Sequence, residues 1–218
     1  MKLVIGNKNY SSWSLRPWLA LKVAEIPFEE ILIPLYQADS KARQLAFSPA
    51  GKVPILVDGA VTILDSLAIL EYVAEQYPDR GLWPRAIAAR AHARSVSAEM
   101  HAGFAALRTA MPMNCRATLA GKGHPPEALA DIARIAAIWG DCRARYGNDG
   151  PFLFGAFSNA DAFYAPVVTR FLTYGVALPD VCRDYVNAVR ALPAMLEWDA
   201  AADVESERLA HSEIYAMM

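Results

Sequence analysis

A short segment rich in turn-forming residues, YPDRGLWP at 77–84, separates two different hydrophobic patterns. Prolines and a glycine this close together interrupt both helices and strands. Before the segment, short apolar runs alternate with helical ones, which is typical of an α/β unit. After it, apolar residues recur at helical spacing. The sequence therefore predicts an α/β domain at 1–78, a linker at 79–86 and an all-helical domain at 87–218.

The first domain is expected to follow the order βαβαββα. Strands are predicted in KLVIGN, FEEILIPL, VPILVDG and AVTIL, and helices in PWLALKVAE, SKARQLAF and DSLAILEYVAEQY. The last two strands meet at Asp58-Gly59, a dipeptide typical of tight turns. The helix of residues 13–25 has Pro17 near its start, and Ser14 has the side chain of an N-cap.

The second domain begins with a long helical pattern. Residues 87–111 contain one residue that disfavours helix, Gly103. The next periodic segment, PPEALADIARIAAIWGDCRARYG, has Gly147 as a C-cap. A third segment, SNADAFYAPVVTRF, opens with Ser158 and Asp161 at the spacing of a capping box. We therefore expect helices only in this part of the chain.

Composition excludes several classes of function. With 55% hydrophobic and 20% charged residues and a formal charge of -2, the chain is typical of a globular protein with a core. The arginines at 80, 85, 90 and 94 form a local cluster, but the chain as a whole is acidic. We interpret the cluster as a solvated or inter-subunit face and expect no nucleic-acid binding.

The sequence shows no pattern of a secreted or membrane-spanning protein. The apolar run at the N-terminus is too short for a signal peptide, and no later run approaches the length of a membrane span. A cytoplasmic protein without membrane contact is therefore expected.

Cys115, Cys142 and Cys182 are widely spaced and form no CxxC pair. This pattern disfavours a disulfide framework, a metal site and a dithiol centre, and favours packing thiols.

Two segments of the first domain are candidates for binding an amino-acid terminus. In GKVPILVDG, Pro54 begins a strand, either as an edge position or as a cis proline that turns the Val53 N–H and C=O toward an extended peptide. Asp65 and Ser66 start a helix, where free N–H groups and the helix dipole favour a carboxylate. A single side chain is enough to cap this helix, so capping explains only one of the two residues. An acidic side chain beside an anion site suits a ligand that also carries an ammonium group.

The loop NKNYSSWS places Ser11 and Ser12 between the first strand and the first helix. A hydroxyl there can donate to an anion held near the helix N-terminus. A serine nucleophile is the alternative, with His92, His101, His124 or His211 as its base. The chain lacks a GxSxG elbow, which disfavours this alternative.

Together these segments resemble the cytosolic glutathione S-transferases of serine type and bacterial type. YSSWSLRPWLALK resembles the serine loop and first helix of the zeta class, and GKVPILVDG resembles the cis-proline segment. DSLAILEYVAE resembles the segment that binds the γ-glutamyl group, and SNADAFYAP resembles the capped helix of the second domain. The resemblance covers nearly the whole chain and implies a thioredoxin-like first domain.

The resemblance also implies site residues. Ser11 matches the hydroxyl that donates to the glutathione sulfur, with Ser12 beside it. Val53 and Pro54 match the clamp on the cysteinyl unit, and Lys52 is within reach of the glycyl carboxylate. Asp65 and Ser66 match the γ-glutamyl contacts, which agrees with the amino-acid terminus inferred from the residues. Trp13 stands where the zeta class has cysteine, and Tyr10 is a second candidate donor.

The resemblance implies an enzyme that uses glutathione as co-substrate, without metal, to attack a small electrophilic or apolar second substrate or a peroxide. The second substrate is expected in a pocket between the domains. The candidate residues of this pocket are Tyr10, Trp13, Arg94, Ser97, His101, Phe104 and Arg108. A homodimer is implied as well. Two alternatives remain open: a binding protein that has kept the fold without turnover, and a glutathione-dependent isomerase of zeta type.

Overall fold

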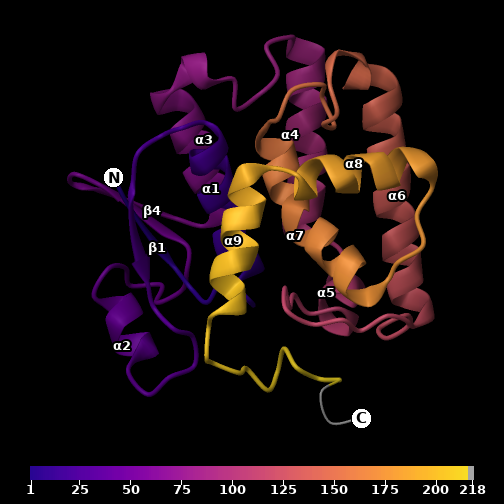
Figure 1. Ribbon diagram of the computed structural model, residues 1–218. Coiled ribbons are helices and arrows are strands. Elements are labelled where there is room, and N and C mark those ends of the chain that lie inside the picture. The colour runs from indigo at the N-terminus through magenta and orange to yellow at the C-terminus, as the bar shows by residue number, and fades with distance from the viewer. Residues whose placement is uncertain (216–218) are drawn as a thin grey trace.

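The computed structural model describes residues 1–215, and Figure 1 shows a sheet with its helices beside a group of longer helices. The strands are β1 (Lys2–Ile5), β2 (Glu29–Leu32), β3 (Ile55–Asp58) and β4 (Val61–Leu64). The helices of this half are α1 (Ser12–Val23), α2 (Ser40–Leu45) and α3 (Ser66–Gln76). Their sequence order confirms the predicted βαβαββα pattern.

The sheet has the strand order β2-β1-β3-β4. β1 is parallel to β2 and antiparallel to β3, and β4 is antiparallel to β3. Leu3, Ile5 and Leu56 face the main core, whereas Val4 and Ile55 belong to a smaller cluster. This alternation follows from the period of two in a strand. The arrangement is the expected thioredoxin-like fold.

The remaining helices form the second half of the molecule. They are α4 (Ile87–Ala102), α5 (Ala105–Ala110), α6 (Pro126–Tyr146), α7 (Asn159–Tyr174), α8 (Asp180–Arg190) and α9 (Pro193–Asp203). α7 is buried along nearly its whole length and packs against α1, α4 and α8. The side chains of Trp18 on α1 and Trp198 on α9 meet edge to face. One hydrophobic core therefore includes residues of both halves.

The predicted linker contributes to this core. Leu82 and Trp83 are buried, and the carbonyl of Leu82 accepts a hydrogen bond from the Asn159 N–H at 2.8 Å. The segment thus anchors the start of α7 as well as connecting the two halves. The boundaries proposed at 78 and 87 stay a prediction.

The long helix expected over residues 87–111 is interrupted, and this expectation was wrong. α4 ends at Ala102 and α5 begins at Ala105. Gly103 is extended, and Phe104 takes the left-handed conformation with φ +61°. The Phe104 ring is buried in the core. Helical spacing counted across this break therefore does not place residues on one face.

The start of α1 also differs from the prediction. The helix begins at Ser12, so Pro17 lies inside it rather than in its first turn. The N-cap is Ser11, whose Oγ accepts from the Ser14 N–H at 3.4 Å. Ser14 is not the cap because its Oγ accepts from the Gly6 N–H, at 3.0 Å, beside the end of β1.

Other terminal signals were predicted correctly. Gly147 is the C-cap of α6, and Ser158 and Asp161 form a capping box at the start of α7. The Asp58-Gly59 turn connects β3 to β4. The three cysteines are free thiols, and burial raises the pKa of each.

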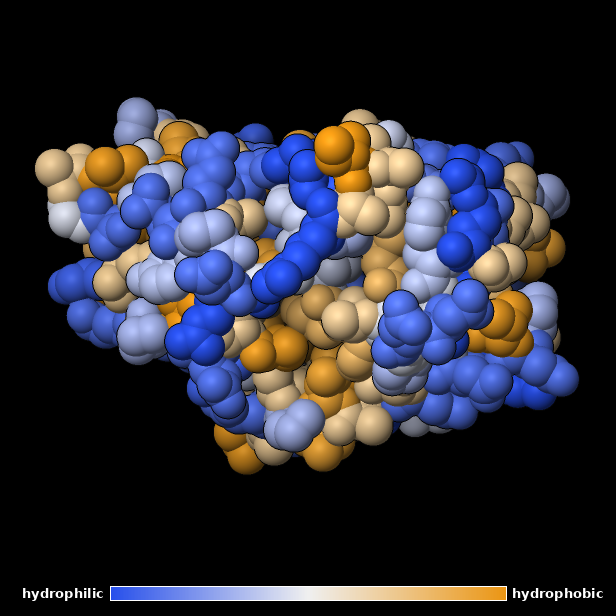
Figure 2. Space-filling model, turned by 90° about the horizontal axis from the view of Figure 1, so that it is seen from above, coloured by the Kyte–Doolittle hydropathy of each residue, from blue (hydrophilic) through white to orange (hydrophobic). Residues whose placement is uncertain are grey.

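The surface seen from above has hydrophobic side chains gathered in its middle and hydrophilic side chains on both sides (Figure 2). In residues 1–215, no helix combines the length and the apolar character that crossing a membrane requires. The same part of the chain has no group of three or more histidine, cysteine, aspartate or glutamate residues placed to hold a metal ion.

Candidate functional site

Two neighbouring cavities lie along the loop between β1 and α1. The larger, about 620 Å³, contains Ser11 and Ser12 in its wall. The smaller, about 400 Å³, contains Asp65 and Ser66. The two cavities share Trp13, Lys52 and Val53. A ligand with two functional ends can therefore reach both the serine loop and the N-terminus of α3. The full lining of the smaller cavity is Trp13, Ala50, Lys52, Val53, Pro54, Leu64, Asp65 and Ser66.

The serine loop has a defined hydrogen-bond direction. Ser14 is fully buried, and its Oγ already accepts from the Gly6 N–H. In the part of the chain that the structure describes, the hydroxyl of Ser14 has one acceptor, Ser11 Oγ at 2.7 Å. Because a buried hydroxyl donates when an acceptor is in reach, the Ser11 O–H is left free to donate elsewhere. Ser11 lies in the wall of the larger cavity, so this free O–H can meet a ligand there.

Asp65 and Ser66 form the start of α3. Asp65 is the N-cap and has a positive φ, with φ +74° and ψ 138°, and its Oδ1 accepts from the Leu67 N–H at 2.7 Å. Such a backbone is uncommon for a residue other than glycine, and strained backbone of this kind clusters at functional sites. Ser66 is buried, and its Oγ accepts from Nη1 of Arg16 at 3.2 Å. The carboxylate and the hydroxyl thus lie in the wall of the same cavity at the positive end of a helix.

The Val53-Pro54 peptide bond is cis, as one of the two interpretations of this proline expected. The strand β3 begins after it, at Ile55. Within residues 1–215, the N–H and C=O of Val53 have no hydrogen-bond partner in the protein. They are available to an extended peptide. Lys52 is exposed and lies in the wall of both cavities.

Only some of the residues expected to hold a second substrate lie in the wall of the larger cavity. Tyr10, Trp13 and Arg108 lie in the wall of the larger cavity. Arg94 instead forms an exposed ion pair with Glu71, with Nη2 2.8 Å from Oε2. The others, Ser97, His101 and Phe104, are also absent from this wall: Ser97 and Phe104 are buried, and His101 faces Asp65.

The wall of the larger cavity is basic. Arg108 and Arg170 both contribute to its wall, whereas no Asp or Glu of residues 1–215 does. Arg170 donates to the carbonyl oxygens of Met111 and Pro166, at 2.7 and 3.2 Å. Burial lowers the pKa of Arg170, and the nearby charge of Arg108 acts in the same direction. Burial also lowers the pKa of Arg108. An anion in this cavity would reduce the repulsion between the two guanidinium groups.

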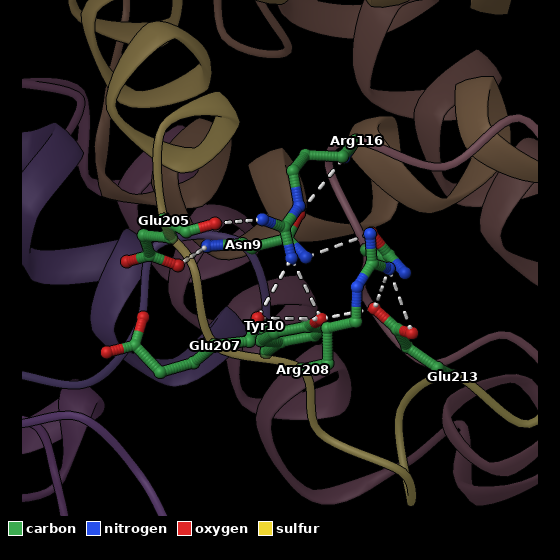
Figure 3. Close-up of polar contacts among 8 residues, drawn as sticks. Asn9, Tyr10, Arg116, Glu205, Glu207, Arg208 and Glu213 are labelled. Atoms are coloured by element: carbon green, nitrogen blue, oxygen red, sulfur yellow. Dashed lines mark hydrogen bonds and ion pairs between the residues drawn. The ribbon is translucent and has the colours of Figure 1, made fainter.

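The segment that follows α9 makes polar contacts with the serine loop (Figure 3). The Glu205 carboxylate accepts hydrogen bonds from the N–H groups of Lys8 and Asn9, at 2.6 and 3.0 Å. Arg116 donates to the carbonyl of Glu207, and its Nη2 donates to the Tyr10 hydroxyl at 3.0 Å. Leu209, His211 and Ser212 of the same segment line the larger cavity.

The Tyr10 hydroxyl belongs to this network rather than to the open cavity. Its closest partner is the carboxylate of Glu213 (Figure 3). Burial and the hydrogen bond to Glu213 raise the pKa of Tyr10. A hydroxyl that already donates to a carboxylate has no second hydrogen for a ligand, so Ser11 is the better placed donor.

Sequence reasoning missed two kinds of residue. Arg16 and Arg170 are lone charges within apolar helical segments, and that interruption is a signal that was available. The segment of Glu205 to Ser212 carries no comparable signal, because its approach to the cavity depends on the path of the chain after α9.

Comparison with known proteins identifies the family. Residues 10–76 match the model of the glutathione S-transferase N-terminal domain. The maleylacetoacetate isomerase of Pseudomonas aeruginosa is 30% identical over 191 residues, which cover 82% of this chain and 84% of that protein. The chain belongs to the glutathione S-transferase family.

Other relatives of this family match over a shorter length. The probable maleylacetoacetate isomerase of Caenorhabditis elegans is 38% identical over 93 residues, which cover 43% of this chain. The chain spans 42% of the length of that relative and 41% of the length of glutathione S-transferase 1 of Dianthus caryophyllus. These matches therefore cover less than half of either relative.

Solved structures share the fold over nearly the full chain. A glutathione transferase homologue from Burkholderia with bound glutathione has a TM-score of 0.68 and 22% identity, and covers 94% of this chain and 98% of its own. A bacterial maleyl pyruvate isomerase of the zeta class has a TM-score of 0.67 and 23% identity, and covers 95% and 100%. At these identities the likeness shows the fold.

Proposed function

We propose that this protein is a glutathione-dependent transferase that binds glutathione across the two cavities. The observation that carries the proposal is the smaller cavity, which combines the Asp65 carboxylate, the Ser66 hydroxyl and the free backbone of Val53. A carboxylate for an ammonium, a hydroxyl donor at a helix N-terminus for a carboxylate, and an extended backbone edge match the γ-glutamyl end of a peptide. Lys52 supplies a cation for the glycyl carboxylate.

The cysteinyl thiol then lies toward Ser11. A free thiol has a pKa of about 8.5, and each unit of lowering needs about 1.4 kcal/mol of preferential stabilisation of the thiolate. The free Ser11 O–H and the N-terminus of α1 both stabilise a negative charge at this position. The thiolate attacks an electrophilic carbon in the larger cavity, a C–S bond forms, and the leaving group departs with its electron pair. A peroxide oxygen is the alternative electrophile.

Glutathione binding should depend on the two residues that begin α3. We expect Asp65→Ala and Ser66→Ala each to weaken binding by about ten-fold to a hundred-fold, because each removes a hydrogen bond to a charged group. Isothermal titration calorimetry of the purified protein with glutathione measures this directly.

Ser95→Ala is the matched control for this titration, because Ser95 is exposed on α4 and its hydroxyl donates to the Ala91 carbonyl. It should bind glutathione as the wild type does. A wild type with no detectable affinity would contradict the proposal and favour a binding protein that has kept the fold without its usual ligand.

Family membership supports two further parts of the proposal. We infer a cytoplasmic homodimer, as is typical of the glutathione S-transferase family. The second substrate is a small electrophile held in the larger cavity, where Trp13, Pro112 and Met113 supply apolar contacts. Sedimentation velocity of the wild type measures the oligomeric state.

The basic wall of the larger cavity favours a second candidate function, a glutathione-dependent isomerase that acts on a dicarboxylate. Arg108 and Arg170 provide two cations without an acidic partner in the cavity wall of the described chain. The relative from Pseudomonas aeruginosa is named a maleylacetoacetate isomerase. Trp13 occupies the position of the zeta-class cysteine. The thiolate that adds to the substrate would therefore come from glutathione and not from this position of the protein. Cis–trans conversion of a maleyl diacid by the wild type, followed in the ultraviolet with glutathione present, tests this candidate.

Arg108 should select for anionic second substrates. We expect Arg108→Gln to raise KM about ten-fold for a chloronitrobenzoate and to leave KM for the uncharged chloronitrobenzene nearly unchanged, because only the first loses a charge-assisted contact. Lys122→Gln, which removes an exposed cation outside the cavity, is the control. An equal rise for both substrates would show that Arg108 acts through the fold of the α4–α5 turn instead.

A further inference from the structure

Arg16 is an unusual residue to find inside α1. It is fully buried, and its guanidinium lies between the rings of Trp13 and Phe163, at 4.2 and 4.9 Å from their centres. Nε and Nη2 have no hydrogen-bond partner, and no carboxylate of residues 1–215 forms an ion pair with it. Burying an unpaired charge is unfavourable, and two aromatic faces compensate only in part. Packing alone therefore does not explain Arg16.

The remaining nitrogen of Arg16 makes two polar contacts. Nη1 donates to Ser66 Oγ at 3.2 Å and lies 3.5 Å from Nδ1 of His101. On the other side of the same imidazole, Nε2 lies 3.3 Å from Oδ2 of Asp65. Arg16 on α1 and His101 on α4 thus connect to both residues that begin α3.

The donors and acceptors of this group can be assigned from chemistry. A guanidinium only donates, so both hydrogens of Arg16 Nη1 point outward, to Ser66 Oγ and to His101 Nδ1. Nδ1 therefore accepts, and the single imidazole hydrogen lies on Nε2, from which it is donated to Asp65. A neutral His101 agrees with its surroundings, because burial and the charges of Arg16 and Arg108 lower its pKa against the opposing effect of Asp65.

This pattern fixes how Ser66 and Asp65 meet a ligand. The oxygen of Ser66 is occupied by a donor, so its own O–H is free to donate into the cavity and suits a carboxylate. The Asp65 carboxylate has lone pairs free for an ammonium group, while His101 and the Leu67 N–H hold its orientation.

We propose that Arg16 and His101 are positioning residues for the amino-acid end of glutathione. Arg16 orients the Ser66 hydroxyl toward the γ-glutamyl carboxylate, and His101 orients Asp65 toward the ammonium. The inference rests on the proposed function, because it assigns the two ends of a ligand to the smaller cavity.

A double-mutant cycle tests the link between Arg16 and Ser66. Glutathione affinity is measured by calorimetry for the wild type, Arg16→Met, Ser66→Ala and the double variant. Each single change should weaken binding about ten-fold, and the double variant should be no weaker than the weaker single variant, because both changes remove one oriented donor. If the double variant binds glutathione about a hundred-fold more weakly than the wild type, the two losses are independent and the link is overturned.

Two synthetic analogues separate the carboxylate from the ammonium. 4-Aminobutanoyl-cysteinylglycine lacks the γ-glutamyl carboxylate, and glutaryl-cysteinylglycine lacks the amino group. The loss caused by Arg16→Met should disappear with the first analogue and persist with the second. The loss caused by His101→Leu should disappear with the second analogue and persist with the first. Losses that are equal for glutathione and both analogues would indicate a general structural role and overturn the inference.

His101 keeps the proposal testable if Arg16→Met fails to fold, because its side chain is partly exposed, at 22%. His101→Gln should retain glutathione affinity within about two-fold, since an amide can accept from Arg16 and donate to Asp65, whereas His101→Leu should lose about ten-fold. Equal affinity for both variants and the wild type overturns the inference alone. A wild type that binds none of the three peptides overturns the proposed function and the inference with it.

Discussion

Replacing Ser11 by alanine should raise the thiol pKa of bound glutathione by about one to two units, with little change in glutathione affinity. The reason is that Ser11 Oγ already accepts from the Ser14 hydroxyl and N–H, so its own hydrogen is the one available to a thiolate. A charge-assisted hydrogen bond of about 1.5–3 kcal/mol accounts for a shift of this size. At a pH below the thiol pKa, kcat/KM should fall about ten-fold to a hundred-fold. The ultraviolet absorbance of the bound thiolate, followed against pH, measures the shift.

Two neighbouring hydroxyls provide matched controls for this experiment. Tyr10→Phe removes a hydroxyl that donates to Glu213 and should leave the thiol pKa unchanged. Ser12→Ala removes the neighbouring serine of the loop, which also lies in the cavity wall. If Ser12→Ala raises the pKa and Ser11→Ala does not, then Ser12 is the donor. Because Ser11 also caps α1, its variant should lose about 1 kcal/mol of stability, and that loss is measured separately by thermal unfolding.

Asp161→Ala should cause a large loss of stability. The Asp161 carboxylate is fully buried and accepts from the N–H groups of Leu153 and Ser158, at 3.0 and 2.8 Å. Removing it leaves two buried donors without partners and removes the capping box of α7, for a total of about 3 kcal/mol. For a chain of this size the melting temperature should fall by about 6–12 °C.

Differential scanning calorimetry and urea unfolding both measure the effect of Asp161→Ala. Asp161→Asn keeps one acceptor oxygen and should lose roughly half as much. A loss below about 1 kcal/mol for the alanine variant would show that water or a shifted backbone satisfies the two N–H groups.

The parts of the fold that the sequence predicted depend on short-range rules. Hydrophobic period and turn residues were sufficient for the order βαβαββα, and the Ser158–Asp161 spacing was sufficient for the start of α7. The N-cap of α1 was not predicted, because Ser11 and Ser14 both have suitable side chains. Ser11 is the N-cap because the Ser14 hydroxyl instead accepts a hydrogen bond from the Gly6 N–H, beside the end of β1.

Positions set by tertiary packing were the ones that sequence reasoning missed. Gly103 alone does not end a helix, and α4 stops there because Phe104 turns into the core. That break moves Arg108 to another element, so its place in the cavity does not follow from helical spacing. The loop serines and the start of α3 could be named from sequence as candidates. Arg16, which connects them to α4, required the packed structure.

The contact between Glu205 and the loop of Lys8 and Asn9 has a consequence for how the protein is made. During synthesis the loop leaves the ribosome long before its partner, since 196 residues separate Asn9 from Glu205. At about 5–20 residues per second, this delay is on the order of 10 to 40 seconds. The sheet can form during that interval, but the two N–H groups of the loop stay with water until the later segment arrives. The newborn chain can therefore form its sheet before the serine loop has all its hydrogen-bond partners.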